Sequence, residues 1–314
     1  MDLYPSDLEE SVRVASEEYL RDNVLLTDCR DRPPVLWHQM AEMGWFGISI
    51  SEDKGGIGLG HGVEALVFAE MGRHLAPLGA IAAAVAARVA SDAGDDALAD
   101  DIIAGKVRMG LAVENGDRLR VFEADKADHF VLVTDKGAQI FARDNADWPI
   151  SDCLDLSTKQ ALIARPDATP RASVEGSGPA RHQAICATAY ALGASEAARD
   201  MASEYAKTRE QFGKAIGSFQ GIKHLCADMM VRSSSARAQL LFAALSIDEG
   251  AADVDFQLAA AKRLADNAAI QNSRFNIQVH GGIGMTDEAD PHLVLKRAHV
   301  LEFISPVKTD ALLV

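Results

Sequence analysis

A short stretch in the C-terminal half, residues 209–220, combines residue types that can bind a phosphorylated ligand. It reads REQFGKAIGSFQ, and its side chains of chemical interest are Arg209, Gln211, Phe212, Phe219 and Gln220. An arginine can bind phosphate through paired charge-assisted hydrogen bonds, a capacity that a plain linker does not need. The alternative for Phe212 and Phe219 is packing inside a helical core, and the sequence leaves both interpretations open.

A second stretch, QVHGGIGMTDEADPHLVLKRA at residues 278–298, ends one helix and starts another. Between them lies a glycine cluster: Gly281, Gly282 and Gly284. The simpler interpretation is a tight turn that needs positive φ angles, and the alternative is a close approach of the backbone to a pyrophosphate. We expect the next helix to start near Thr286, with Asp287 and Glu288 in its first turn. These acids would repel phosphate, so the preceding turn or Arg209 would have to bind the anion.

Composition narrows the class of protein. The net charge of -15 argues against nucleic acid as a partner, because phosphates are neutralised by clustered Lys and Arg. The four cysteines contain no C-x-x-C pair, so we expect scattered buried thiols and no metal site. No apolar run approaches the roughly 20 residues of a membrane span, and the acidic N-terminus lacks the basic and apolar regions of a secretory signal. We therefore expect a cytoplasmic protein.

Hydrophobic periodicity predicts a mainly α fold with a β insertion. The first helices are expected at residues 6–27, 35–44 and 63–75, with Ala- and Val-rich helices up to about residue 104. A small β region follows, and the composition of residues 165–178 indicates a linker. Long helices are then expected at residues 180–208, 220–249, 253–279 and 287–303. The predicted domains are a helical N-terminal domain (1–104), a shortened β middle domain with linker (105–178) and a C-terminal four-helix bundle (179–314).

The two stretches together resemble a known family. The pattern R-x-Q-F-G-K-x-I-x-x-F-Q-x-x-x-H-x-x-A-D-M, followed by Q-x-H-G-G-x-G-x-T-x-E, is similar to motifs of the acyl-CoA dehydrogenase flavoenzymes. The glycine-rich MGWFGISISEDKGGIGLG at residues 43–60 also looks like that family. The resemblance implies an acyl-CoA dehydrogenase-like fold, FAD as cofactor and an acyl-CoA thioester as substrate.

In that family FAD lies between the β domain and the bundle, and a neighbouring subunit's bundle completes the site of its ADP end. By resemblance, Arg209 pairs with the FAD pyrophosphate, and Gln211 and Phe212 continue that contact. Gln220 matches a glutamine near the adenosine end. The segment that lies along the ADP is matched by Gln278, Val279, Gly281 and Gly282.

The middle domain departs from the family pattern. Family members carry a Thr-Glu-x-x-x-Gly-Ser-Asp segment and a Trp-Ile-Ser/Thr segment, which hold the flavin ring. Here only Glu114 lies near the first, and Trp148 is far from the place of the second. The equivalent of several strands is missing, so we expect this chain not to bind the flavin ring by itself.

The catalytic base of the family is missing as well. The reaction removes an α-proton from the thioester while a hydride passes to the flavin, which requires a positioned, desolvated carboxylate. One family position reads Ser-Pro here, at residues 305–306, and the other reads Arg-His-Gln-Ala, at residues 181–184. Glu302 and Asp310 are out of register, and we expect Glu302 to be solvated or ion-paired. We expect His182 to be a core or surface histidine, so no residue is assigned as catalytic.

A shortened chain without a base resembles one subunit of the α2β2 acyl-CoA dehydrogenases that some bacteria use on steroid side chains. The ending EADPHLVLKRA at residues 288–298 is similar to that branch. A full-length partner subunit would supply the base and the flavin pocket, and an electron-transfer flavoprotein would accept the electrons. Two alternatives stay open: a homo-oligomeric dehydrogenase with an atypical base such as Glu302, and a non-catalytic subunit that serves assembly.

Overall fold

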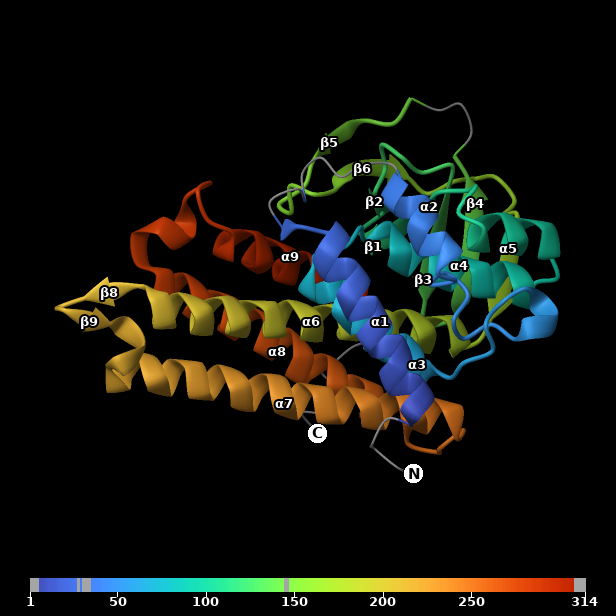
Figure 1. Cartoon of the computed structure of the whole chain (residues 1–314). Coiled ribbons are helices and arrows are strands. Elements are labelled where there is room, and N and C mark those ends of the chain that lie inside the picture. The colour runs from blue at the N-terminus through green and yellow to red at the C-terminus, as the bar shows by residue number, and fades with distance from the viewer. Residues whose placement is uncertain (1–5, 27–28, 30–34, 144–146, 308–314) are drawn as a thin grey trace.

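The computed structural model describes residues 6–26, 29, 35–143 and 147–307. The fold has three regions: N-terminal helices, a middle sheet and a C-terminal helical bundle (Figure 1). The helices of the first region are α1 (Asp7–Asn23), α2 (Val35–Glu42), α3 (His61–Arg73), α4 (Gly79–Asp92) and α5 (Asp96–Ile103). Ser6 and Glu9 form a capping box that starts α1, each side chain accepting from the other's backbone N–H. None of the helices in these ranges has the length and apolarity needed to cross a membrane.

The middle region is one sheet with the strand order β5-β6-β2-β1-β3-β4-β7. Its strands are β1 (Met109–Asn115), β2 (Arg118–Phe122), β3 (His129–Thr134), β4 (Gly137–Ala142), β5 (Ile150–Asp152), β6 (Lys159–Ala164) and β7 (Ala172–Glu175). All neighbours are antiparallel except β1 and β3. The linker expected at residues 165–178 is wrong in part, because β7 pairs with β4 inside it. The Pro and Gly residues that suggested a linker belong to the turns around β7.

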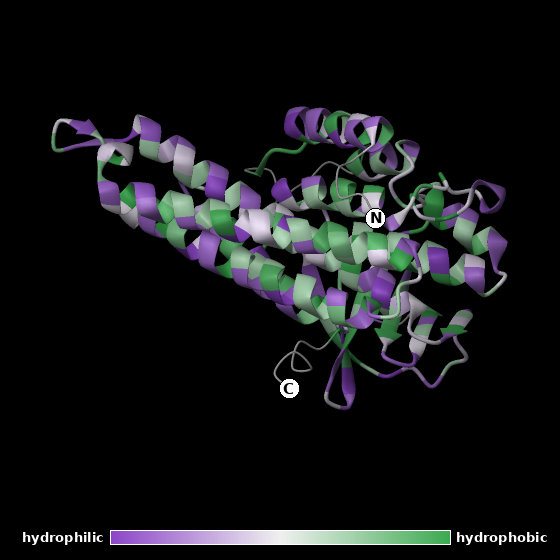
Figure 2. Ribbon diagram, turned by 90° about the horizontal axis from the view of Figure 1, so that it is seen from below, coloured by the Kyte–Doolittle hydropathy of each residue, from purple (hydrophilic) through white to green (hydrophobic). Residues whose placement is uncertain are grey.

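The bundle consists of α6 (Gly178–Thr208), α7 (Gln220–Asp248), α8 (Val254–His280) and α9 (Pro291–Ile304). Figure 1 shows α6, α7 and α8 side by side, with a hairpin of β8 (Glu210–Gln211) and β9 (Lys214–Ala215) at one end. In Figure 2 the apolar residues of these helices concentrate where the helices pack together. The expected start of the last helix near Thr286 is wrong. Asp287 and Glu288 lie in the preceding turn, and α9 begins at Pro291, whose ring favours a first helical position.

Close packing of α3 against α6 sets the N-terminal helices on the bundle. A Cβ added to Gly193 would lie 1.9 Å from the Ala69 carbonyl oxygen. A Cβ added to Gly72 would lie 2.3 Å from the Tyr190 carbonyl oxygen. Only a hydrogen atom fits at either position, so the two glycines determine how closely the helix backbones approach.

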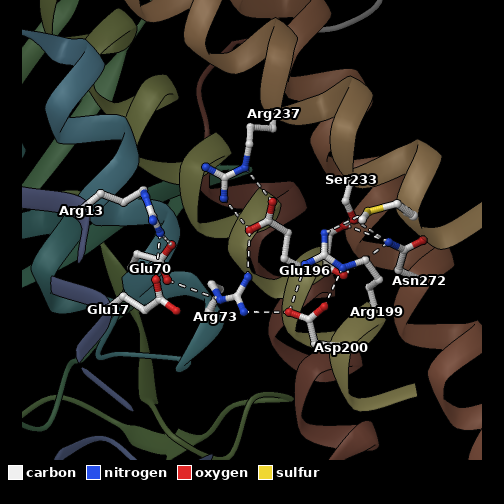
Figure 3. Close-up of polar contacts among 12 residues, drawn as sticks. Arg13, Glu17, Glu70, Arg73, Glu196, Arg199, Asp200, Ser233, Arg237 and Asn272 are labelled. Atoms are coloured by element: carbon white, nitrogen blue, oxygen red, sulfur yellow. Dashed lines mark hydrogen bonds and ion pairs between the residues drawn. The ribbon is translucent and has the colours of Figure 1, made fainter. Parts of the chain in front are cut away.

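Charged side chains reinforce the same junction (Figure 3). Arg73 of α3 pairs with Glu196 and Asp200 of α6 at 3.2 and 2.7 Å. Arg237 of α7 donates two hydrogen bonds, of 2.8 and 2.6 Å, to the Glu196 carboxylate. The nearly fully buried Glu70 lies 3.4 Å from Arg73. Because the buried carboxylates each lie against a guanidinium, three helices are joined without an isolated buried charge.

Arg297 of α9 joins the bundle to both other regions. Its side chain is 1% exposed, and its Nε donates to the Asp155 carboxylate of the loop before β6. Nη2 donates to the Ser157 hydroxyl at 2.6 Å and to the Leu75 carbonyl at 3.2 Å, and Nη1 donates to the Ala76 carbonyl at 2.7 Å. One buried guanidinium therefore ties α9 to the sheet region and to the segment that follows α3.

Candidate functional site

One end of the bundle carries a groove built from four segments: the end of α6, the β8–β9 hairpin, the start of α7 and the turn after α8. Its volume is about 780 Å³. It is lined by Tyr205, Arg209, Gln211, Phe212, Ile216, Phe219, Gly221, Ile222, Leu225, Val279, His280, Gly281, Gly282 and Ile283. The groove therefore brings together six of the eight residues predicted to bind a cofactor: Arg209, Gln211, Phe212, Val279, Gly281 and Gly282.

The other two predicted residues do not line the groove. Gln220 is the first residue of α7 and follows the lining residue Phe219, and its side chain is exposed. Gln278 lies in the last turn of α8 and is also exposed. Both lie next to lining residues in the sequence, and the resemblance that selected them gives no information about the direction of a side chain.

Arg209 stands where α6 ends. Its backbone is extended, with φ −74° and ψ 124°, and its N–H still bonds the Tyr205 carbonyl at 2.9 Å. Ile216 donates its N–H to the Arg209 carbonyl at 2.8 Å, which closes the base of the hairpin. The Arg209 side chain is exposed and pairs with no carboxylate in the described ranges of the chain. An uncompensated guanidinium at a groove is suited to bind an anion.

Phe212 occupies the tip of the hairpin in a strained conformation. The two turn residues, Phe212 and Gly213, have φ of +54° and +77°, the pattern of a type I′ turn. Phe212 is 92% exposed, so its interpretation as a core residue is wrong. Its ring meets the half-buried ring of Phe219 edge to face at 6.1 Å, and Lys214 lies 4.4 Å over the Phe219 ring. A ring this exposed adds little to the packing of the described residues.

The three glycines after α8 differ in what the fold requires of them. Gly281 ends the helix with φ +67°, and a Cβ on Gly284 would lie 2.9 Å from the Cβ of His280, so both fit the turn interpretation. Gly282 has neither a positive φ nor any atom within 4 Å of an added Cβ. Neither turn geometry nor packing among the described residues requires glycine there. Its backbone is left open at the groove, which favours the ligand interpretation for that position.

Sequence reasoning missed an aromatic pair in the groove. The rings of Tyr205 and His280 stack at 4.1 Å with an interplanar angle of 21°. His280 Nδ1 bonds the Asn276 carbonyl at 2.9 Å. Burial lowers the pKa of His280, although that hydrogen bond opposes the effect, so the imidazole is neutral at pH 7. Arg209 is then the one charged side chain among the lining residues that the structure describes. The motif contains His280, but only the folded chain shows its stacking.

A second cavity, of about 640 Å³, lies between the sheet and α9. It is lined by Val113, Glu114, Asn115, Arg120, Phe122, Cys153, Leu154, Gln160, His299, Val300 and Phe303. Glu114 is the one carboxylate among these residues. Its side chain is 56% exposed and pairs with Arg165, so it is neither desolvated nor free to act as a base.

The two positions where the family places its base carry no carboxylate. Ser305 caps the end of α9, and Arg181 at the start of α6 pairs with Asp255 at 2.7 Å. Of the two alternatives for His182, core or surface, the structure shows the core one, because the side chain is 4% exposed and its Nε2 bonds Glu64 Oε1 at 2.9 Å.

The two acids that are out of register have different outcomes. Glu302 is exposed and does not line the cavity, and its carboxylate bonds His299 Nδ1 at 3.1 Å. This confirms the expectation of a solvated or paired residue. Asp310 lies outside the described residues.

Comparison with known proteins identifies relatives over most of the chain. The family model described as acyl-CoA dehydrogenase, C-terminal domain, matches residues 178–305, and the one described as acyl-CoA dehydrogenase, N-terminal domain, matches residues 6–107. The acyl-CoA dehydrogenase FadE34 of Mycobacterium tuberculosis is 34% identical over 83% of this chain, which spans only 38% of FadE34. The acyl-CoA dehydrogenase IpdE2 of the same organism is 33% identical over 84% of this chain and 80% of IpdE2.

Solved structures show the same fold. The match with the structure of a steroid ACAD named Tcur3481-Tcur3483 covers 98% of this chain and 96% of the matched chain. The TM-score is 0.82 and the sequence identity is 22%. The predicted architecture of helical N-terminal region, small sheet and C-terminal helices is confirmed by this match and by the two family models.

Proposed function

We propose that this chain, which belongs to the acyl-CoA dehydrogenase family, works as one subunit of a heteromeric acyl-CoA dehydrogenase and holds the ADP end of its FAD. The observation that carries the proposal is a contrast between two sites. The groove at the end of the bundle is formed by residues suited to a dinucleotide, whereas the cavity beside α9 contains no desolvated carboxylate. This contrast supports a chain that contributes the ADP-end contacts and, among the described residues, no desolvated carboxylate at the cavity.

The groove suits FAD on three features of this chain. Arg209 offers an exposed guanidinium without a carboxylate partner in the described ranges, as a pyrophosphate requires. Gly282 leaves a stretch of backbone open, and the exposed ring of Phe212 can cover an adenine. FAD, when bound, supplies the hydride acceptor of the α,β-dehydrogenation. The residues of this chain bind and orient its ADP end.

The missing half of the site calls for a partner subunit. Proton removal from a thioester needs a carboxylate of raised basicity, and neither Glu114 nor Glu302 offers one. FadE34 contains, in one polypeptide, a unit like this chain and a larger remainder, since the match spans 38% of it. We infer that a separate full-length dehydrogenase subunit supplies the base and the flavin pocket here, in an α2β2 assembly.

The substrate is proposed to be a steroid side-chain CoA ester. The support is the likeness in fold to a protein described as a steroid ACAD, together with the apolar lining of the cavity by Phe122, Leu154 and Phe303. An electron-transfer flavoprotein is the proposed electron acceptor, and the cytoplasm is the proposed location.

Expression with and without the partner tests the proposal. We expect the chain purified alone to be nearly free of flavin, and the co-expressed complex to contain FAD and to oxidise an acyl-CoA. Stoichiometric FAD in the lone chain would contradict the shared site.

Substitution of Arg209 tests its role within the complex. Arg209→Ala removes charge-assisted hydrogen bonds to a pyrophosphate, so we expect about a 10- to 100-fold loss of FAD affinity. Arg263→Ala, which removes another exposed arginine, on α8, is the matched control and should leave FAD content unchanged. Unchanged FAD content and activity in Arg209→Ala would favour a subunit that serves only assembly.

One observation favours the alternative of a self-sufficient dehydrogenase. His299 lines the cavity, and its Nδ1 is held by Glu302, an arrangement that can orient an imidazole to accept a proton. This alternative predicts acyl-CoA oxidation by the lone chain, abolished in His299→Ala. The absence of activity in the lone wild-type chain after addition of FAD would exclude it.

A further inference from the structure

Away from the groove and the cavity, three side chains of metal-ligand type are buried where α3 packs on α6. They are Glu64 of α3 and, from successive turns of α6, His182 and Cys186, here called the Glu64–His182–Cys186 cluster. A carboxylate oxygen, an imidazole nitrogen and the thiol sulfur lie within 4.8 Å of one another. We propose that this cluster binds one divalent cation of the zinc type, which has a structural role at the junction of the two helices.

The donor types and their spacing suit zinc. Zinc binds thiolate, imidazole and carboxylate at about 2.0–2.3 Å, so neighbouring donors of a tetrahedral site lie about 3.3–3.8 Å apart. His182 and Cys186 are four residues apart on one helix and therefore share a face. Donors already within 4.8 Å reach this geometry by small side-chain movements. One carboxylate and one thiolate balance the charge of the cation, so the buried complex is neutral.

Not every buried polar atom of the cluster has a hydrogen-bond partner among the described residues. Glu64 is 1% exposed, His182 is 4% exposed and Cys186 is fully buried. Glu64 Oε1 accepts from the Ser49 hydroxyl at 3.1 Å and bonds His182 Nε2 at 2.9 Å. Glu64 Oε2 has no hydrogen-bond partner in the described ranges. A buried acceptor without a donor costs about 1–3 kcal/mol, and a bound cation would remove that cost.

Two cluster members differ in charge in the metal-free chain. Burial acts to raise the pKa of Glu64, but His182 holds it below its ordinary value, so the carboxylate is ionised at neutral pH. Burial and the nearby Glu64 raise the pKa of Cys186 well above its ordinary value, so the thiol is protonated without a metal.

His61 is a candidate for the fourth ligand and for the entry route. Its ring centroid lies 5.7 Å from that of His182. Its Nδ1 bonds Asp248 of α7 at 2.6 Å, and its side chain is 13% exposed. An imidazole oriented by a carboxylate on one nitrogen commonly binds metal, or a metal-bound water, through the other. Its partial exposure is the reason that His61 is the candidate for the entry route.

Metal analysis of the intact chain tests the proposal. The chain is produced in zinc-supplemented medium, washed with EDTA in the folded state and analysed by mass spectrometry for metals. We expect about one zinc ion per chain in the wild type and less than about a tenth of that in Cys186→Ala and Glu64→Gln. Cys226→Ala is the matched control, because it removes a more accessible thiol on α7 and should keep the metal.

Growth with cobalt instead of zinc gives a second, spectroscopic measurement. A thiolate-to-cobalt absorption band in the near ultraviolet is expected in the wild type and in Cys226→Ala, and its loss in Cys186→Ala. If a variant does not fold, the presence or absence of the thiolate-to-cobalt band in the wild-type chain decides whether the proposal holds. A wild-type chain without metal and without the band overturns the proposal and leaves an ordinary buried Glu–His pair. Metal retained by folded Cys186→Ala also overturns it, because the ion then lies elsewhere.

Discussion

Replacement of Arg297 by leucine should destabilise the whole chain more than any surface change on α9. The substitution removes the partner of Asp155, a carboxylate only 5% exposed, and leaves the charge buried. Breaking a buried ion pair in this way costs about 3–5 kcal/mol of unfolding free energy. Neither partner is exposed enough for solvent to screen the loss. The backbone carbonyls of Leu75 and Ala76 lose their donors in the same step.

Urea unfolding followed by circular dichroism measures the effect. Lys296→Leu, which removes a partly exposed cation from the same helix, is the control and should change the unfolding free energy by less than about 0.5 kcal/mol. Asp155→Asn added to Arg297→Leu removes the stranded charge. We expect the double variant to regain at least about 1 kcal/mol over Arg297→Leu alone.

The pH dependence offers an independent check on the same pair. Burial alone would raise the pKa of Asp155, but Arg297 holds it below its ordinary value. The pKa is thus lower in the folded than in the unfolded chain, so this stabilisation is present above the unfolded value, about 4, and is lost as pH falls through the folded value. The double variant should lack this acid-dependent loss. A cost below about 1 kcal/mol for Arg297→Leu, with no gain in the double variant, would refute the reasoning.

Two other substitutions should stabilise the chain, in contrast to Arg297→Leu. Burial raises the pKa of Glu70, so its ionised form is penalised in the folded chain above the unfolded pKa. Glu70→Gln should therefore increase the free energy of unfolding at pH 7, by an amount that shrinks as pH falls toward 4. Urea titrations of both proteins at pH 7 and pH 4 measure this gain. A gain of equal size at the two pH values would contradict the prediction. Phe212→Asn should relieve about 1 kcal/mol of hairpin strain, because asparagine tolerates positive φ, and should still lower the FAD content of the complex. Equal flavin content in that variant and the wild type would contradict a cofactor role for the ring.

The long helices could be predicted from sequence because their apolar spacing persists over many turns. Residues 180–208, 220–249 and 253–279 correspond closely to α6, α7 and α8. The start of α9 was misjudged because Asp287 and Glu288 have the residue type of a first helical turn, whereas Pro291 begins the helix. β7 was missed because four residues between Pro- and Gly-containing turns carry too little periodicity.

The sequence predicted most of the residues that line the groove, but not how their side chains are arranged. The motif identified Arg209 and Gly282, which the folded chain brings to one groove. It gave no information about side-chain direction at Gln220 and Gln278. The stack of Tyr205 on His280 joins α6 to the end of α8, and such tertiary contacts leave no local pattern in the sequence. The Glu64–His182 bond spans 118 residues and was invisible for the same reason.

Three features of the groove are not explained by packing among the described residues. A ligand shared in a complex would explain them. Phe212 is 92% exposed in a backbone conformation that costs about 1–3 kcal/mol, so it lowers the stability of the chain that carries it. Arg209 extends a charge without a described partner, and Gly282 is glycine where neither φ nor packing requires it. Their convergence on one groove supports the proposal that they serve a bound ligand, and a dinucleotide shared with a second subunit would account for all three.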